Sequence, residues 1–514
     1  MTGFSTLSAL IIVPAAAAVL VMLIPERRRE LVRPLGVILS LLPLPLAFLL
    51  FMEFERGEAG FQFVERVVWI EQLGVAWHLG VDGISLLLVV LTTVLVPVAL
   101  GASMRIDHRV RLFVAMNLLL EAGLIGVFLS LDLFLFFVFF EVILIPMAFI
   151  IGIWGSENRV YAAVKFFLYT AFGSALMLAG IIALAFILRD QTGELGFSYL
   201  AMLDLELGTT AQRWLFGAFA LAFAIKVPVF PFHTWLPDAH VEAPTAGSVL
   251  LAGVLLKLGT YGLLRFNLPL FPEAALDFVP VLATLAVVGV IYGAIVAIVQ
   301  PDLKKLVAYS SVSHLGFIVL GTFALTSQSL QGGVVQMINH GLTTGALFLL
   351  VGIIYERRHT KLIADFGGLA SSMPVFAGMF LFIAFASIGL PGLNGFVGEF
   401  LILIGSYPTL PLYTVVAAAG VILAAVYLLW AYERVFTGPL TNPANQRVSD
   451  LSVSEVLVFV PLVALIILLG VYPKVALDVI GPSTDAVLSR IEATTGYEAP
   501  EPGGPGLVLS GGGE

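Results

Sequence analysis

The sequence contains no cysteine, and charged residues make up only 11% of its 514 positions. The missing cysteines exclude disulfide bonds, thiolate-held iron–sulfur clusters and cysteine nucleophiles from this chain. A soluble protein has about a quarter of its residues charged, whereas 60% of the residues here are hydrophobic. There is also no basic patch with interleaved aromatic residues, so nucleic acid is not an expected partner. These shortages predict a polytopic protein that lies in a lipid bilayer.

Long hydrophobic segments occupy most of the chain. About fourteen of them approach the ~20 residues that a helix needs to cross a bilayer, which predicts an all-α membrane fold. The expected transmembrane helices are 4–24, 33–52, 84–104, 111–130, 132–154, 161–188, 212–235, 244–265, 279–300, 303–325, 330–355, 374–405, 411–433 and 453–473. The leader MTGFST carries no positive charge, so the first helix is expected to be retained and not removed as a signal peptide.

Lysine and arginine are concentrated in alternate loops. If the N-terminus lies outside, the inner loops contain basic clusters at 27–29, 304–305 and 357–358, whereas the outer loops contain scattered single residues. Basic loops remain on the cytoplasmic side of a membrane. We therefore expect a multi-pass protein of the bacterial inner membrane with both termini on the periplasmic side.

A weak internal repeat divides the predicted helices. The fourth to eighth helices form one five-helix block and the ninth to thirteenth form another, and the fourth helix of each block is broken. Because five is odd, the two copies must cross the membrane in opposite directions. Broken helices paired in inverted repeats are typical of ion-translocating folds. The predicted divisions are three N-terminal helices (1–110), a first repeat (111–265, broken near 226–231), a second repeat (279–433, broken near 389–395), a last helix (453–473) and a Gly- and Pro-rich tail expected to be disordered (494–514).

Few ionisable residues lie deep inside the predicted helices. A charge at the bilayer centre costs about 2.5–3.5 kcal/mol on insertion scales, so each such residue is a candidate for function. They are Glu121, Glu141, Lys226, Lys257, His314, His340 and Glu399. Alternatives remain open, because a Lys–Glu pair can simply hold helices together, a histidine can satisfy a hydroxyl group, and two histidines can ligate a haem.

For three further polar residues a structural role is favoured over a functional one. Lys165 lies one turn inside its helix and can extend its amine to the inner surface. His233 and Asp238 follow the proline break, and we expect them to brace the backbone there.

Lys226 stands two residues before Pro228 and five before Pro231, an arrangement that suits a proton carrier. Such a carrier must change charge near neutral pH. Burial disfavours the charged form of a lysine and a nearby carboxylate favours it, so movement of Glu141 would decide whether Lys226 keeps its proton. The prolines free backbone groups, which a membrane tolerates only beside protein or water. The break is therefore expected to let water reach the amine.

Several longer motifs together carry a family resemblance. They include "FEVILIPMAFIIGIWG", "IKVPVFPFHTWLPDAHVEAPTAGSVLLAGVLLKLGTYGLLRF", "MINHGLTTGALFLLVGIIYERRHT" and "GLPGLNGFVGEFLILIGSY". From about Asp82 to Tyr472 the chain resembles the antiporter-like subunit M of NADH:quinone oxidoreductase, respiratory complex I, which is the counterpart of mitochondrial chain 4. It resembles less closely the subunits of multisubunit Na⁺/H⁺ antiporters and of membrane-bound hydrogenases, and these form the alternative.

The resemblance implies a proton-translocating subunit of a redox-driven translocase. It implies that Glu141 partners Lys226, that Lys257 is the central lysine, that His314 and His340 continue the path and that Glu399 ends it. It assigns no role to Glu121. No cofactor, metal or redox centre is expected in this chain. FMN, iron–sulfur clusters and quinone are expected in partner subunits, and the partners include sibling antiporter-like subunits.

Overall fold

The computed structural model describes residues 5–500 of the chain. In this range twelve helices are long and apolar enough to cross a membrane. Two further crossings are each divided between two helices, which are α10 (Thr209–Lys226) with α11 (Trp235–Glu242), and α18 (Pro374–Ser387) with α19 (Asn394–Ser406). Every predicted crossing therefore has a counterpart, and the predicted all-α membrane fold with two broken helices is confirmed.

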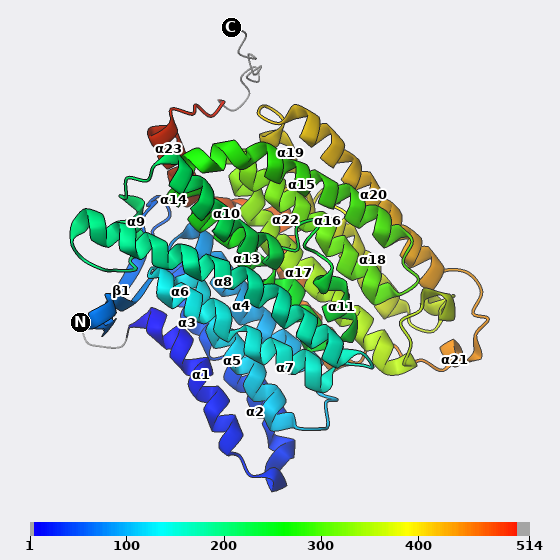
Figure 1. Ribbon diagram of the computed structural model, residues 1–514. Coiled ribbons are helices and arrows are strands. Elements are labelled where there is room, and N and C mark those ends of the chain that lie inside the picture. The colour runs from blue at the N-terminus through cyan, green and yellow to red at the C-terminus, as the bar shows by residue number, and fades with distance from the viewer. Residues whose placement is uncertain (1–4, 501–514) are drawn as a thin grey trace.

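The unbroken crossings flank the two broken ones (Figure 1). The N-terminal group is α1 (Thr6–Leu23), α2 (Arg29–Ser40) continued by α3 (Pro43–Glu53), and α4 (Gly83–Ala102). Four helices precede the first broken helix: α5 (Val110–Leu129), α6 (Leu133–Val142), α7 (Leu144–Trp154) and α8 (Arg159–Thr192). The segment from α12 (Thr245–Leu250) to α14 (Leu268–Leu270) follows it. The second broken helix is preceded by α15 (Pro272–Ile298), α16 (Leu303–Phe323) and α17 (Ser327–Arg358). It is followed by α20 (Pro411–Phe436), α21 (Pro443–Gln446) and α22 (Val453–Val471).

Three elements outside the predicted helices cover one face of the molecule. They are the antiparallel hairpin of β1 (Gln62–Ile70) and β2 (Val75–Val81), the short helix α9 (Tyr199–Leu203) and the C-terminal helix α23 (Lys474–Thr495). Figure 1 shows β1, α9 and α23 toward the same end of the bundle. We call this the hairpin face. Of the predicted tail, residues 494 and 495 complete α23, and residues 501–514 lie outside the described residues.

α23 crosses the ends of helices from both repeats at the hairpin face. Ser483 Oγ accepts from the Gly83 N–H at 3.0 Å, and a Cβ on Gly83 would lie 1.8 Å from the Val479 carbonyl oxygen, so only glycine allows this approach. Arg490 Nε donates to the Pro269 carbonyl at 2.7 Å, and Ser327 Oγ donates to Asp485 at 2.6 Å. The helix therefore fastens α4, α14 and α17 together outside the apolar region.

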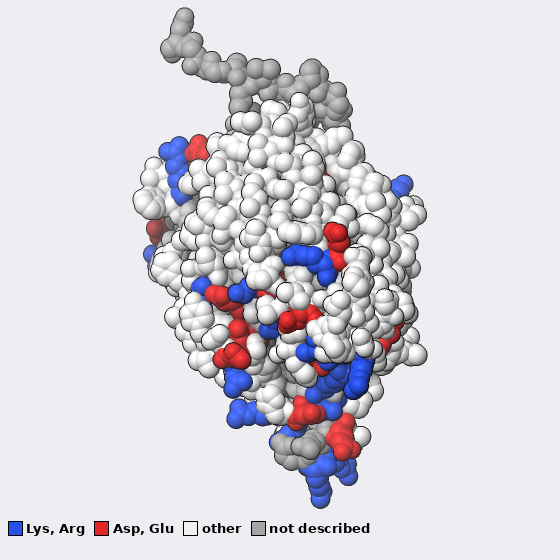
Figure 2. Space-filling model, turned by 90° about the vertical axis from the view of Figure 1, so that its right-hand side faces the viewer, with Lys and Arg blue, Asp and Glu red and all other residues white. Residues whose placement is uncertain are grey.

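The opposite face carries the basic loops. We call it the lysine-rich face after Lys304 and Lys361, whose amines bind the chain there. Charged side chains gather over the lower part of the view in Figure 2, while most of the remaining surface is uncharged. Lys361 Nζ donates to the Val241 carbonyl at 2.7 Å, and Lys304 Nζ donates to the Ala243 carbonyl at 2.6 Å. Burial lowers the pKa of Lys361, although the carboxylates of Asp302 and Glu242 oppose this shift. Two lysines thus satisfy carbonyls at the end of α11.

α17 lies at the centre of the bundle and is wholly buried along its apolar window. Glycines let α19 approach it closely. A Cβ on Gly405 would lie 2.4 Å from the Ser329 backbone nitrogen, and a Cβ on Gly398 would lie 2.3 Å from Gln336 Oε1. Because α17 also packs against α4, α12, α16, α18 and α23, it is the helix through which both repeats and the flanking helices contact one another.

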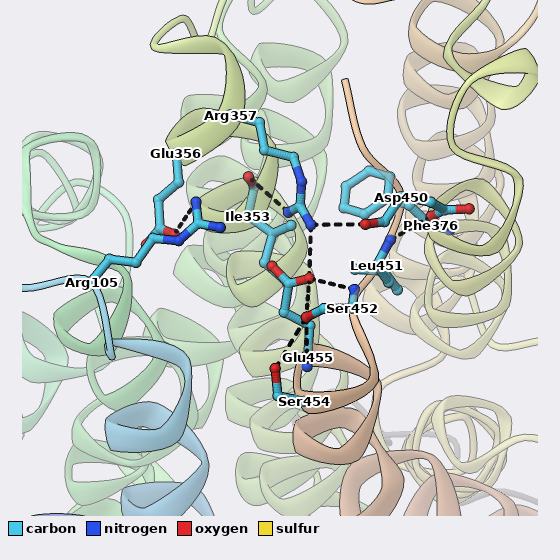
Figure 3. Close-up of polar contacts among 10 residues, drawn as sticks. All are labelled: Arg105, Ile353, Glu356, Arg357, Phe376, Asp450, Leu451, Ser452, Ser454 and Glu455. Carbon is cyan, nitrogen blue, oxygen red and sulfur yellow. Dashed lines mark hydrogen bonds and ion pairs between the residues drawn. The ribbon is translucent and has the colours of Figure 1, made fainter. Parts of the chain in front are cut away.

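Paired charges fix the last crossing to α17 at the lysine-rich face (Figure 3). Arg357 Nη2 donates to Glu455 at 2.7 Å and to the Asp450 carbonyl at 3.1 Å, and Arg105 pairs with Glu356 at 3.3 Å. The Asp450 carboxylate accepts the free N–H groups of Val375 and Phe376 at the start of α18. This network joins the ends of α17, α18 and α22.

Substitution of Arg265 tests the most buried ion pair of the fold. Arg265 Nη2 binds Asp82, and the two side chains are 5% and 2% exposed. Arg265→Met should destabilise the protein by about 3–5 kcal/mol, because it leaves a buried carboxylate without its partner. The measurement is the thermal unfolding midpoint of the detergent-purified protein.

The matched control is Arg213→Met, because Arg213 pairs with Asp277 where the side chains are 56% and 42% exposed. An exposed pair contributes only about 0–1 kcal/mol. Equal shifts in the two variants would contradict a special role for the Asp82–Arg265 pair.

Candidate functional site

The first helix break leaves Lys226 as the last residue of α10. Pro228 and Pro231 have no N–H groups, so the helix cannot continue through them. The carbonyl of Ala224 accepts instead from the Val229 N–H at 2.9 Å, and that of Ile225 accepts from the Trp235 indole at 2.9 Å. The break is therefore held open by specific hydrogen bonds, and it presents the lysine at a fixed depth.

The Lys226 amine is buried against aromatic rings. The side chain is 1% exposed, and Nζ lies 4.7 Å from the centre of the Phe140 ring and 5.8 Å from that of Phe166. Nζ makes no hydrogen bond with any described residue. The half-buried carboxylate of Glu141 acts on this amine electrostatically, but the two form no ion pair within residues 5–500. The structure therefore places the expected partners near each other without direct contact.

Lys257 lies between two widened helical turns. The segment after α12 contains a π-helical turn at η3 (Leu251–Leu255), then α13 (Lys257–Gly262), then a second π-helical turn at η4 (Leu263–Asn267). π-helical turns occur frequently at functional sites. The Ala252 carbonyl, five residues before Lys257, accepts a hydrogen bond from its amine. The widened turn thus supplies one partner for a charge that has no access to solvent.

A row of four titratable side chains runs from Lys257 to Glu399. Lys257 Nζ lies 2.7 Å from His340 Nδ1, and the rings of His340 and His314 are 5.9 Å apart between centres. His314 Nδ1 lies 3.0 Å from Glu399 Oε1. We call these four residues the central axis. The sequence analysis named each of them, and the structure brings all four together.

Glu399 ends the axis beside the second helix break. α18 ends at Ser387 and α19 begins at Asn394, with Gly389 between them at a φ of 77°, a conformation that favours glycine. A Cβ on Gly389 would lie 2.9 Å from Glu399 Oε2. The carboxylate therefore packs directly against the backbone of the break.

Three polar residues around the axis were missed by the sequence analysis. Gln336 Nε2 donates to Glu399 Oε1 at 3.2 Å, Tyr427 OH lies 3.1 Å from His314 Nε2, and Asn339 Nδ2 donates to Gln336 Oε1 at 3.3 Å. Gln336 and Asn339 lie four and one positions before His340 in the same helix. Only Gln336 lies one helical turn from the buried histidine, so this spacing was a signal for Gln336 alone.

Other candidate residues lie apart from the axis. Glu121 is wholly buried in α5, and neither carboxylate oxygen bonds to a described residue. Lys165 forms an ion pair with Asp238 at 2.7 Å, so its amine braces the segment after the first break. His233 stacks on Phe230 and packs against Tyr292, in agreement with a bracing role.

The comparisons with known proteins identify the family of the chain. Residues 130–426 match the family model described as NADH:quinone oxidoreductase/Mrp antiporter, TM. The chain is 47% identical to NADH-quinone oxidoreductase subunit M of Rhodobacter capsulatus, with 88% of this chain and 89% of the relative covered. The chain belongs to the NADH:quinone oxidoreductase/Mrp antiporter transmembrane family.

Two further members of this family show the same likeness. NADH-ubiquinone oxidoreductase chain 4 of Marchantia polymorpha is 44% identical, over 92% of this chain and 95% of the relative. A chain of respiratory complex I from Thermus thermophilus is 34% identical, with a TM-score of 0.85 over 94% of this chain and 99% of that one. The resemblance to antiporter-like subunits of complex I is therefore confirmed.

The side chains of the axis are of types that can gain and lose protons. Among residues 5–500 there is no group of three or more histidine, cysteine, aspartate or glutamate side chains placed to hold a metal ion. Amine, imidazole and carboxyl groups in contact can exchange protons. The arrangement therefore suits proton transfer.

Gly341→Ala tests the packing that brings Lys257 to His340. A Cβ at this position would lie 2.7 Å from the Gly253 carbonyl oxygen, so α17 must move away from η3. We expect a cost of about 1–3 kcal/mol and a loss of proton transfer. The measurements are thermal stability and proton pumping by the assembled complex.

Gly345→Ala is the control, since the nearest atom to its Cβ would be 3.7 Å away. Both Gly→Ala substitutions raise helix propensity by the same amount. Any difference in stability or pumping between the two variants therefore measures the steric clash at Gly341. Equal results would contradict the assigned role of the Gly253–Gly341 contact.

Proposed function

We propose that the chain is a proton-translocating membrane subunit of a redox-driven NADH:quinone oxidoreductase. The observation that carries this proposal is the row of four titratable groups Lys257, His340, His314 and Glu399, in which Lys257 contacts His340, His314 contacts Glu399 and the two histidine rings lie 5.9 Å apart between centres. A purely structural ion pair would need two partners and not four titratable groups in sequence. A haem site is disfavoured because the two histidines already contact Lys257 and Glu399.

Lys226 and Glu141 supply the switch at the start of the path. The Lys226 amine faces aromatic rings and makes no hydrogen bond with a described side chain or carbonyl. The position of the Glu141 carboxylate therefore largely decides the free energy of protonating Lys226. At ~5 Å and an effective dielectric of 20, such an attraction is roughly 3 kcal/mol. Withdrawal of Glu141 would release the Lys226 proton toward Lys257, with water at the helix break as the intermediary.

The energy for transport comes from outside this chain. Moving one proton against ~180 mV costs about 4 kcal/mol. The proposal places no redox centre here and assigns FMN, iron–sulfur clusters and quinone to partner subunits. The neighbours would include sibling antiporter-like subunits, whose conformational and charge changes reach Glu141 through its half-buried side.

The proposed location is the bacterial inner membrane, with both termini on the periplasmic side. This orientation puts the hairpin face outside and the lysine-rich face inside, as the distribution of basic loops predicts. The alternative, a component of a multisubunit Na⁺/H⁺ antiporter or membrane-bound hydrogenase, is less favoured. The relatives that are 44–47% identical over about nine tenths of the chain are complex I subunits.

Lys226→Ala tests the function directly. The assembled complex should lose at least about tenfold in both quinone reduction and proton pumping, because the first carrier is gone. Lys165→Ala is a matched control, since its amine pairs with Asp238 away from the axis. Normal coupled turnover by the Lys226→Ala complex would overturn the proposed path.

Glu399 should require a titratable group and not merely a polar one. Glu399→Gln keeps the size and hydrogen-bonding capacity of the side chain but cannot take up a proton, so we expect a loss of pumping of about tenfold or more. Glu399→Asp should retain more activity, since the acid remains. Proteoliposomes that carry each complex allow pumping and electron transfer to be measured in parallel. Equal damage in both variants would indicate a packing role.

A further inference from the structure

Two cavities lie along the seam between α4 and α22. The first has a volume of about 150 Å³ and lies at the lysine-rich face, where its polar lining includes Arg105, Ser454 and Glu455. The second has a volume of about 200 Å³ and lies toward the hairpin face, where Ala476 of α23 lines it. The rest of its lining is apolar and comes from α3, α4, α17 and α22. The same three helices, α4, α17 and α22, therefore line both cavities.

The accessible side of α4 connects the two cavities. In this fully described helix only Val90, Val94, Gly101 and Ala102 are partly exposed, and the other residues are buried. Val90, Val94 and Gly101 are four and seven positions apart, so they share one helix face. A Cβ on Gly101 would lie 3.5 Å from Val458 of α22, which is an ordinary contact distance. We call this face and the two cavities the α4–α22 groove.

The groove has the dimensions of one lipid leaflet. Arg105 and Leu91 are 14 positions apart, or ~21 Å along a helix, and half a bilayer with its headgroups is about 20–22 Å thick. α4 and α22 contact each other, so a further helix, which is about 10–12 Å wide, cannot enter between them. An apolar cavity also stays free of water. A single acyl chain is the occupant that fits.

The polar end of the groove offers charges of both signs (Figure 3). The Arg105 side chain is 60% exposed and pairs through Nη1 with Glu356 at 3.3 Å, so its guanidinium remains open to a phosphate. Glu455 Oε2 accepts from Arg357 and from the N–H and hydroxyl groups of Ser452. Glu455 Oε1 takes part in none of these bonds. A guanidinium and a carboxylate oxygen at one cavity complement a headgroup that carries both a phosphate and an ammonium group.

The apolar cavity adjoins the part of α17 that belongs to the central axis. Ile338 and Leu342, on either side of His340 in the sequence, line this cavity. Leu91 of α4 lines it too, and a Cβ on Gly341 would lie 2.8 Å from Leu91 Cδ2. An acyl chain in the cavity therefore packs against the helical turn that presents His340.

We propose that the α4–α22 groove holds one zwitterionic glycerophospholipid with a primary amine, of the phosphatidylethanolamine class. Its phosphodiester binds Arg105, and its ammonium group donates to Glu455 Oε1. One acyl chain runs past Gly101 and Val94 into the apolar cavity, where it supplies the dispersion contacts that Leu342 otherwise lacks on that side. The lipid belongs to the leaflet on the lysine-rich side and is held at both ends.

A photoreactive phosphatidylethanolamine with a diazirine near the end of one acyl chain tests the site. The assembled complex is illuminated in proteoliposomes that contain this probe, and mass spectrometry locates the label. We expect more label on Ile338 and Leu468, which line the apolar cavity, than on the lipid-facing side of α8. Unlabelled phosphatidylethanolamine should compete about tenfold better than phosphatidylcholine, whose quaternary ammonium has no N–H to donate to a carboxylate.

Two pairs of variants locate the chain and the headgroup separately. Gly101→Phe should abolish labelling of the apolar cavity because it fills the groove, whereas Gly101→Ala should preserve it because a Cβ fits there. Arg105→Gln should lower the apparent affinity for the probe about tenfold, since a charge-assisted hydrogen bond to phosphate is lost. Arg159→Gln, at an exposed arginine of the lysine-rich face, is its control and should have no effect. The arginine pair decides the matter if Gly101→Phe fails to assemble.

Three results would contradict the proposal. Equal labelling of α8 and the cavity in every variant would indicate ordinary surrounding lipid only. Equal competition by phosphatidylcholine would exclude recognition of a primary amine. Cross-linking of benzoylphenylalanine at position 468 to a neighbouring subunit, without lipid label in the groove, would identify a protein as the occupant. Labelling requires no turnover, so a Lys226→Ala complex that fails to pump should still take up the probe, and the two proposals are tested independently.

Discussion

The contact between the Lys257 amine and the His340 ring joins the two repeats in the interior of the bundle. Lys257 belongs to the first repeat and His340 to the second, and neither side chain reaches solvent. Acceptors close by offset the cost of burying an amine, and for Lys257 these are one carbonyl and one imidazole nitrogen. Gly253 and Gly341 allow the two backbones to approach closely enough for this contact. The same contact therefore holds the two repeats together and links the titratable groups Lys257 and His340.

The two helix breaks meet the same constraint in different ways. At the first, an indole and a backbone N–H satisfy the carbonyls that the prolines leave free. At the second, a glycine in the left-handed region turns the chain, and Glu399 packs against it. Freed backbone groups thus lie beside a lysine in one repeat and beside a carboxyl group in the other. The pseudosymmetry places titratable groups of opposite charge at matching interruptions.

Much of the architecture could be read from the sequence, because a bilayer demands long apolar helices and penalises buried charge. The crossings, both breaks and the four residues of the axis follow from that demand. The hairpin at 62–81 and α23 could not be read in this way, because they lie outside the apolar segments and depend on contacts such as Gly83 with Ser483. Gln336, Asn339 and Tyr427 are uncharged, so insertion cost does not single them out. The separation of Lys226 from Glu141 depends on how Phe140 and Phe166 pack around the amine.

The complete burial of α17 has a consequence for how the protein is made. The segment from α12 to α14 and helices α16 and α17 are the most buried crossings, and they are also among the least apolar. Their low hydropathy makes insertion of each segment into lipid during synthesis less favourable. The more apolar helices at the periphery, such as α1, α15 and α22, can enter the bilayer unaided. We therefore expect the central helices to depend on contacts with the other helices in order to stay in the membrane.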